Sequence, residues 1–197
     1  MKVAIFSGGD FNAVKILPYD KLICADKGYL YAKKLNLTPD LILGDFDSLG
    51  YVPKCAEVYP TDKNYSDTQL AVIKAIELGA TEIDIYYSLG GRIDHELFNI
   101  HILKFCKDKG VFATILSENS YITLISGKGS YPSKLGNFVS LVPFSSTAHI
   151  NKSKGLKYPL DNLTIVKGET LTLSNVATQN TVYIEVSSGE ILYISFL

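Results

Sequence analysis

The sequence predicts a chain with two parts of different class, an α/β part with a largely parallel sheet and then an all-β sandwich or barrel. Two observations support this fold class. Up to about residue 120, short apolar runs alternate with segments of helical period. After about Tyr121, strand-like runs follow one another with no helical period between them. We therefore expect one domain at residues 1–120 and a second at residues 121–197.

The first part contains six apolar runs, rich in β-branched or aromatic residues and bounded by Gly, Pro or Asp, that read as strands. In chain order they are KVAIF, KLICA, LILG, AEVY, EIDIYY and VFATIL. Helices are expected between them at Gly28–Leu35, Ser66–Leu78 and Asp94–Lys107. The middle helix is the best marked, because Ser66 and Gln69 form a capping box and Gly79 stands just past its end.

The second part contains six strand-like segments separated by Gly, Ser, Asn or Pro turns. In chain order they are YITLIS, NFVSLVPF, NLTIVKG, ETLTLS, NTVYIEVS and EILYISF. Such a run of short strands is typical of a sandwich or a small barrel. His149 falls between two of the segments, so we expect it in a loop.

Composition and charge exclude several classes of protein. Hydrophobic residues make up 47% of the chain and charged residues 20%, which is typical of a soluble globular protein. The formal net charge of −1 offers no basic surface for nucleic acid. No apolar run is long enough to cross a bilayer, and the first ten residues lack the form of a signal peptide. Because the three cysteines are dispersed and indicate neither a disulfide framework nor a zinc site, we expect a cytoplasmic protein.

Arginine is used only once in the chain. Lys and Arg together number 19, and Arg92, inside SLGGRIDH, is the one Arg among them. An arginine kept in so lysine-rich a sequence indicates a position that needs a planar, bidentate and permanently charged group, such as a phosphate site. Chance placement is the alternative.

Four polar clusters fall where strands end and helices begin, which is the ligand-binding edge of an open parallel sheet. They are ADKG, GDFDS, KNYSD and GGRIDH. In GDFDS, an extended backbone would point Asp45 and Asp47 to one side and Phe46 into the core. Mg²⁺ is a suitable partner for such a pair, since it usually takes one or two carboxylates together with substrate phosphates. A turn whose aspartates cap backbone amides is the alternative.

The remaining clusters add a further acid and several cations. Asp67 follows the N-cap Ser66 and is available to a metal, or it only complements the helix dipole. Arg92 follows two glycines, which allow a ligand close to the backbone, and precedes a helix. Asp94 and His95 could belong to the same site, or serve as an N-cap and a first-turn residue. Together the clusters suit a complex of a metal with a polyphosphate.

In this order, and followed by a β domain, the clusters resemble the thiamine pyrophosphokinase family over nearly the whole chain. The similarity rests on ADKG, GDFDS, K-x-x-S-D-T-x-x-A from Lys63 to Ala71, GGRIDH-x-x-x-N ending at Asn99, GLKYPL and LSN. This resemblance implies an enzyme that transfers the pyrophosphoryl group of ATP to the hydroxyl of thiamine, with Mg²⁺, giving thiamine diphosphate and AMP. It also implies a homodimer with sites between the α/β domain of one subunit and the β domain of the other.

The resemblance assigns roles residue by residue. Mg²⁺ and the phosphates would be held by Asp45, Asp47 and Asp67 in the ATP- and Mg-binding first domain. The nucleotide and phosphate site would be lined by Asp26, Lys63, Ser66, Arg92, Asp94, His95 and Asn99. Thiamine would contact Ser174, Asn175 and Tyr158 in the second domain. The implied catalytic set is Asp45, Asp47, Asp67, Arg92 and Asp94, which would act by positioning and charge stabilisation. Asp67 or Asp94 would accept the hydroxyl proton.

The chain departs from the family pattern in KNYSD, where the family usually has K-D-x-T-D. Asn64 replaces a carboxylate, which would weaken metal binding or change its stoichiometry, whereas Ser66 preserves the helix cap. Two alternative functions stay open at this point. A D-x-D at a strand end also occurs in metal-dependent phosphatases with an aspartate nucleophile, and a non-catalytic sensor of nucleotide or thiamine could retain the same pocket.

Overall fold

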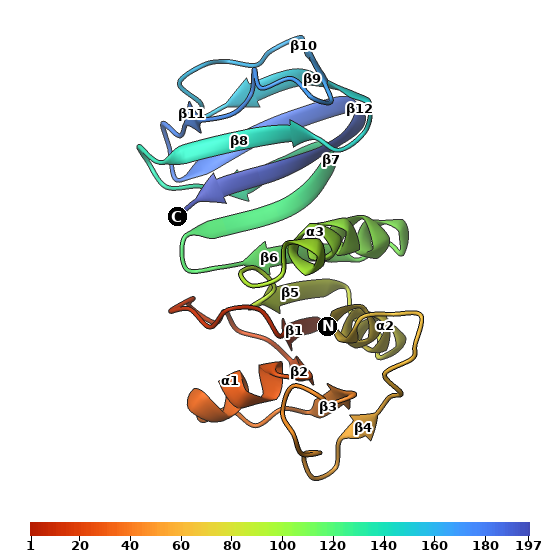
Figure 1. The fold of residues 1–197 in the computed structure, drawn as a ribbon. Helices are drawn as coiled ribbons and strands as arrows, with labels where there is room; N and C mark the ends of the chain where they lie inside the picture. Colours follow the sequence, from red (N-terminus) through yellow and green to blue (C-terminus); the bar gives the residue numbers. More distant parts are fainter. The chain divides into compact units, whose positions relative to one another are not determined.

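A computed structural model describes all 197 residues. The chain forms two compact units, Met1–Glu118 and Asn119–Leu197. Figure 1 shows the elements of each unit along the chain. The first unit mixes strands and helices, and the second is built from strands. The predicted fold class, an α/β part followed by a β part, is confirmed. No helix is both long and apolar enough to cross a membrane.

The first unit is built on a six-stranded sheet in the order β6-β5-β1-β2-β3-β4. Its strands are β1 (Lys2–Phe6), β2 (Lys21–Ala25), β3 (Leu41–Gly44), β4 (Glu57–Val58), β5 (Glu82–Tyr86) and β6 (Phe112–Leu116). All of its pairings are parallel, so the carboxyl ends of all six strands lie at one edge. The central strands β1 and β2 are buried on both faces, which explains why they read as continuous apolar runs without alternation.

Three helices cover the two faces of this sheet. Figure 1 shows α1 (Gly28–Lys34) on one face and α2 (Asp67–Glu77) and α3 (Ile93–Asp108) on the other, as right-handed crossovers require for this strand order. The start of α2 is the one the sequence predicts, because Ser66 Oγ accepts a hydrogen bond from the Gln69 amide at 3.2 Å. Gly79 follows the helix with a φ of +87°, a conformation that favours glycine.

Strand order reverses direction between β1 and β5. From β1 the chain crosses to β2 on one side, whereas from β5 it crosses through α3 to β6 on the other. Loops that diverge in this way leave a crevice at the carboxyl edge, which is where open α/β sheets bind their ligands.

The second unit is an antiparallel sheet organised around its last strand. Its strands are β7 (Ser120–Pro132), β8 (Phe138–Pro143), β9 (Thr147–Lys154), β10 (Leu163–Val166), β11 (Asn175–Val176) and β12 (Thr181–Phe196). Strand β12 pairs with β7 along nearly its whole length, with β9 at its amino-terminal half and with β8 at its carboxyl-terminal half. Strand β10 adds to β9 and β11 adds to β8.

Three details of the second unit differ from the sequence prediction. NTVYIEVS and EILYISF are one strand, β12, because the intervening Ser188 and Gly189 lie in a bulge instead of a turn. A Cβ at Gly189 would lie 2.4 Å from Thr147 O, so glycine is what allows this bulge to pack on β9. His149 lies within β9, opposite Thr164 of β10, and not in a loop.

The third difference is ETLTLS, which forms a turn and not a strand. Its alternation is inverted, since Thr172 is buried and its hydroxyl donates to Leu141 O, while Leu171 and Leu173 are exposed. The orientation of this segment is therefore set by the hydrogen bond of Thr172 and not by burial of the two leucines.

Candidate active site

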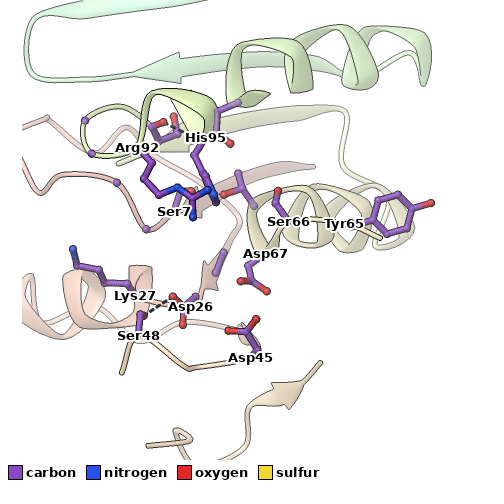
Figure 2. A pocket seen from close by; sticks show the side chains of 18 of the residues that line it. Ser7, Asp26, Lys27, Asp45, Ser48, Tyr65, Ser66, Asp67, Arg92 and His95 are labelled. Carbon is purple, nitrogen blue, oxygen red and sulfur yellow. Dashed lines mark hydrogen bonds between the residues drawn. The ribbon is translucent and has the colours of Figure 1, made fainter. Parts of the chain in front are cut away.

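The carboxyl edge of the sheet in the first unit holds a cleft of about 670 Å³. Five loops line it, following β1, β2, β3 and β5 and preceding α2. Eight of the residues singled out from the sequence line this cleft: Asp26, Asp45, Lys63, Ser66, Asp67, Arg92, His95 and Asn99. Figure 2 shows the carboxylates of Asp26, Asp45 and Asp67 pointing toward a common space, with Arg92 and His95 across from them. Tyr65 points away from that space.

Three carboxylates form a compact acidic group. Asp26, Asp45 and Asp47 each offer an oxygen, and these oxygens lie within 4.8 Å of one another. The oxygen Oδ2 of Asp26 accepts a hydrogen bond from Ser48 Oγ at 2.5 Å, whereas Oδ1 is buried without a hydrogen-bond partner. A buried carboxylate oxygen with no donor is an unfavourable arrangement unless a cation completes it. An all-carboxylate set of this size fits a hard divalent cation such as Mg²⁺.

The backbone that brings Asp45 and Asp47 together is not extended. Strand β3 ends at Gly44, and Phe46 has a φ of +59°. The amide of Asp47 donates to Asp45 Oδ1 at 3.3 Å, which is the aspartate-capped turn that the sequence left as the alternative. Phe46 is buried, as expected. The turn, and not strand alternation, therefore positions the two carboxylates.

Lys63 links the acidic group to the start of α2. Its ammonium nitrogen lies 2.6 Å from Asp45 Oδ2 and 3.2 Å from Asp67 Oδ1, and all three side chains are largely buried. Burial has the largest single effect on Asp45 and would raise its pKa, but the hydrogen bonds from Lys63 and from the Asp47 amide, together with the charge of Lys63, outweigh it and the pKa is lowered. For Asp67 burial dominates and raises the pKa despite the same lysine. Burial, the largest single effect, would lower the pKa of Lys63, but the hydrogen bonds and negative charges of Asp45 and Asp67 together outweigh it and the pKa is raised.

Across the cleft, the loop after β5 carries the arginine. Gly90 and Gly91 have φ values of +82° and +94°, and Arg92 is the N-cap residue of α3 without a side-chain capping bond. Arg92 forms two hydrogen bonds to Asp94, Nε to Oδ1 at 3.1 Å and Nη2 to Oδ2 at 2.6 Å. These bonds lower the pKa of Asp94 to about 2. The side chain of Arg92 is 74% exposed, so it remains accessible to an anion entering the cleft.

Asp94 itself lies just outside the main cleft. It lines a neighbouring hollow of about 260 Å³ together with Ser66, His95, Phe98 and Asn99. Its Oδ1 accepts from the His95 amide at 3.0 Å in the first turn of α3. Asn99 is buried, and its amide donates to Ser88 O at 2.8 Å, which fixes the loop that carries the glycines.

The floor of the cleft consists of hydroxyl groups that the sequence analysis did not single out. Ser7 and Thr68 are buried and share a hydrogen bond between their hydroxyls, and Ser88 is buried with a hydroxyl that has no partner. A signal for two of these residues was present, because Ser7 directly follows β1 and Ser88 follows β5 at the same edge as the predicted clusters.

The predicted thiamine-contacting residues lie in the second unit. Asn175 is buried, and its side chain accepts from the Tyr158 amide at 3.1 Å and donates to Tyr158 O at 2.7 Å. Its amide group therefore holds the GLKYPL loop. Ser174 has a φ of +56°, and its amide donates to Ser140 Oγ at 3.0 Å. Tyr158 is 56% exposed.

Two family models match the chain. The model for "Thiamin pyrophosphokinase, catalytic domain" matches residues 17–115, and the model for "Thiamin pyrophosphokinase, vitamin B1 binding domain" matches residues 128–191. A thiamine pyrophosphokinase of Bacillus subtilis (strain 168) is 30% identical over 189 residues, with 88% of each chain covered. Thiamine pyrophosphokinase 1 of Oryza sativa subsp. japonica is 27% identical over 183 residues, covering 82% of this chain and 68% of the relative.

Solved structures agree with these similarities. The crystal structure of thiamine pyrophosphokinase from Bacillus subtilis superposes with a TM-score of 0.87 at 25% identity, covering 98% of each chain. Thiamin pyrophosphokinase from Candida albicans shares the fold, with a TM-score of 0.78 at 18% identity, covering 100% of this chain and 89% of the other. Fold, cleft and comparisons together define a kinase-type transferase. The chain belongs to the thiamine pyrophosphokinase family.

Proposed function

We propose that this protein transfers the pyrophosphoryl group of ATP to the hydroxyl of thiamine, giving thiamine diphosphate and AMP, with Mg²⁺ as cofactor. One observation carries the proposal: in a chain of this family, a single cleft brings the carboxylates of Asp26 and Asp45 together with the cations Lys63 and Arg92. Carboxylates for a metal on one side and cations on the other are what a metal-bound triphosphate requires. The first unit would bind ATP and Mg²⁺, and the second would bind thiamine.

The acidic group would hold the metal. Asp45, Asp47 and Asp67 are the ligands proposed from the sequence. Of these, Asp45 and Asp47 belong to the compact group, which Asp26 completes with its unpartnered Oδ1. Asp67 faces this group from the start of α2, through Lys63. When bound, Mg²⁺ would supply neutralisation of the negative charge on the phosphate oxygens. The catalytic contribution of these side chains is therefore to position one cation.

On the opposite side, Arg92 would bind the phosphates of ATP. Its fork is held in place by Asp94 and remains exposed, and Gly90 and Gly91 allow a phosphate close to the backbone. His95 and the amino-terminal amides of α3 lie beside it. The hydroxyl oxygen of thiamine would bond to the β-phosphorus as the bond to the oxygen shared with the α-phosphorus breaks, and AMP would leave.

The proton of the thiamine hydroxyl must go to a base. Two carboxylates were candidates from the sequence, and their environments differ. Burial raises the pKa of Asp67, whereas the hydrogen bonds from Arg92 bring the pKa of Asp94 down to about 2. A carboxylate with a higher pKa is the stronger base, so we assign this step to Asp67.

Thiamine would be held by the second unit, with Ser174 and the exposed ring of Tyr158 as contacts. Asn175 would act indirectly, since its amide is engaged by the backbone of Tyr158. We propose that the protein is a homodimer in which each site combines the first unit of one subunit with the second unit of the other. Size-exclusion chromatography with light scattering tests this assembly.

A coupled assay for AMP tests the proposed reaction. Purified protein, ATP and Mg²⁺ are expected to give AMP only when thiamine is added. Release of phosphate from a monoester without thiamine would instead indicate a phosphatase. Binding of ATP or thiamine without production of AMP would indicate a sensor. Either of these two results would contradict the proposed function.

A further inference from the structure

Lys63 pairs with two carboxylates of the cleft, Asp45 and Asp67. Its ammonium nitrogen lies 2.6 Å from Asp45 and 3.2 Å from Asp67, and its side chain is only 12% exposed. Asp45 belongs at the same time to the compact acidic group with Asp26 and Asp47. A single side-chain ammonium is therefore shared by Asp45 of the acidic group and Asp67 at the start of α2.

We propose that Lys63 is a built-in substitute for the divalent cation: it holds the carboxylates in place while no metal is bound, and it must withdraw from Asp45 before a metal can bind. Carboxylates at such short separations repel one another unless a positive charge lies between them. With the ammonium 2.6 Å from Asp45 Oδ2, a metal ion bound to the same carboxylate would lie close to a second positive charge, and the repulsion between the two cations disfavours their binding together.

The local structure allows Lys63 to withdraw without disturbing the fold. Lys63 lies in the loop before α2, outside the helix. The helix begins with its own cap, since Ser66 Oγ accepts from the Gln69 amide. The flexible four-carbon stem of a lysine can thus swing away while Asp67 stays at the first helical position.

The place to which the displaced ammonium of Lys63 moves is inferred from the proposed function, and this is the one part of the proposal that rests on it. Phosphates of a bound nucleotide would accept the ammonium that Asp45 releases. Nucleotide would then tighten metal binding, and metal would tighten nucleotide binding by the same factor. Lys63 would couple the two ligands in this way, in addition to touching a phosphate.

Binding of Mn²⁺ in the absence of nucleotide tests the substitution directly. Free Mn²⁺ is measured by electron paramagnetic resonance during titration of the wild type and of Lys63→Met. Removal of the competing ammonium is expected to tighten Mn²⁺ binding by about tenfold, the change that corresponds to one partly buried ion pair. Mn²⁺ binding to Lys63→Met that is equal to or weaker than in the wild type would overturn the proposal.

Lys27→Met is the matched control for the loss of one positive charge from the cleft. Lys27 lines the same cleft and carries the same charge, but its ammonium is paired with none of the aspartates and lies over the ring of Tyr31. Its removal is expected to tighten Mn²⁺ binding by less than about threefold, because it takes away a nearby positive charge but no ammonium that competes with the metal for a carboxylate. Equal tightening in the two variants would show that the field alone is responsible, and would also overturn the proposal.

Thermal unfolding without metal provides the second readout. Lys63→Met is expected to unfold at a lower temperature than the wild type in chelator, because the carboxylates lose their counter-charge, and to regain more stability than the wild type when Mn²⁺ is added. Lys63→Gln, which keeps a hydrogen-bond donor, serves if the Met variant does not fold. Unchanged stability in chelator would contradict the proposal. None of these measurements uses ATP or thiamine, so failure of the proposed reaction would leave them unaffected.

Discussion

The amide of Gly9 donates a hydrogen bond to Tyr87 O at 2.7 Å, and this bond fastens the loop after β1 to the loop after β5. The next residue continues the contact, since the Asp10 amide donates to Leu89 O at 3.0 Å. These two loops flank the point where strand order reverses, so their connection sets the shape of the cleft at its centre.

Substitution of Gly9 by alanine should therefore destabilise the first unit. A Cβ at Gly9 would lie 2.6 Å from both Tyr87 O and Leu89 O, and backbone atoms cannot easily move away. We expect a loss of about 1–3 kcal/mol in the free energy of unfolding, the usual penalty of overpacking. Gly8→Ala is the matched control, because its Cβ would meet only Lys27 Cβ at 3.7 Å. Urea unfolding that gives equal losses for the two variants would contradict this account.

Loss of the charge on Asp45 should abolish most activity. Asp45→Asn keeps the shape of the side chain but removes a carboxylate shared by the acidic group and Lys63. We expect turnover to AMP to fall by about a hundredfold or more, as for other groups that stabilise charge electrostatically. Asp62→Asn, an exposed aspartate of a neighbouring loop, should leave turnover unchanged. Near-wild-type rates in Asp45→Asn would refute the role of this residue.

The geometry of Arg92 should matter as much as its charge. Two of its nitrogens bind Asp94, so the fork is oriented before a phosphate arrives. A lysine at this position cannot make the bidentate contact, and Arg92→Lys should lower turnover by about a hundredfold or more. Arg92→Ala should be only slightly worse. If steady-state kinetics of Arg92→Lys resemble those of the wild type, a point charge suffices and the assignment fails.

The pair of Arg92 and Asp94 also predicts a pH dependence. Hydrogen bonds from Arg92 bring the pKa of Asp94 from 3.8 to about 2 in the folded protein. Because this folded pKa is depressed, the contribution of Asp94 to stability is present above its ordinary pKa and is lost as pH falls toward 2. Carbon NMR of the carboxyl should show Asp94 still ionised at about pH 3. In Arg92→Gln the midpoint should return toward 3.8, and an unchanged midpoint would exclude Arg92 as the cause.

Much of the first unit could be predicted from sequence because local signals and tertiary demands agree there. Helix α2 is an example, since Ser66, Gln69 and Gly79 determine its two ends by short-range hydrogen bonds and backbone preference. The position of the polar clusters was also accessible, because parallel strands bring their carboxyl ends to one edge.

Contacts between distant segments were harder to predict. Asp26 is 19 residues from Asp45, and only the pairing of β2 with β3 brings the two into one acidic group. The pair of Asp45 and Asp47 looked extended, although Phe46 adopts a left-handed conformation that no local rule requires of a phenylalanine. In the second unit, Ser188 and Gly189 resembled a turn, and the bulge that they form depends on a close contact between Gly189 and β9.

The most direct test of the central claim follows the β-phosphorus of ATP. ATP labelled with ¹⁸O on the non-bridging oxygens of its β-phosphoryl group is incubated with thiamine, Mg²⁺ and the protein, and the products are analysed by mass spectrometry. If the cleft carries out pyrophosphoryl transfer, the label will appear in thiamine diphosphate and the AMP will be unlabelled. Label in free phosphate or pyrophosphate, or ATP left unconsumed while thiamine is present, would contradict the account.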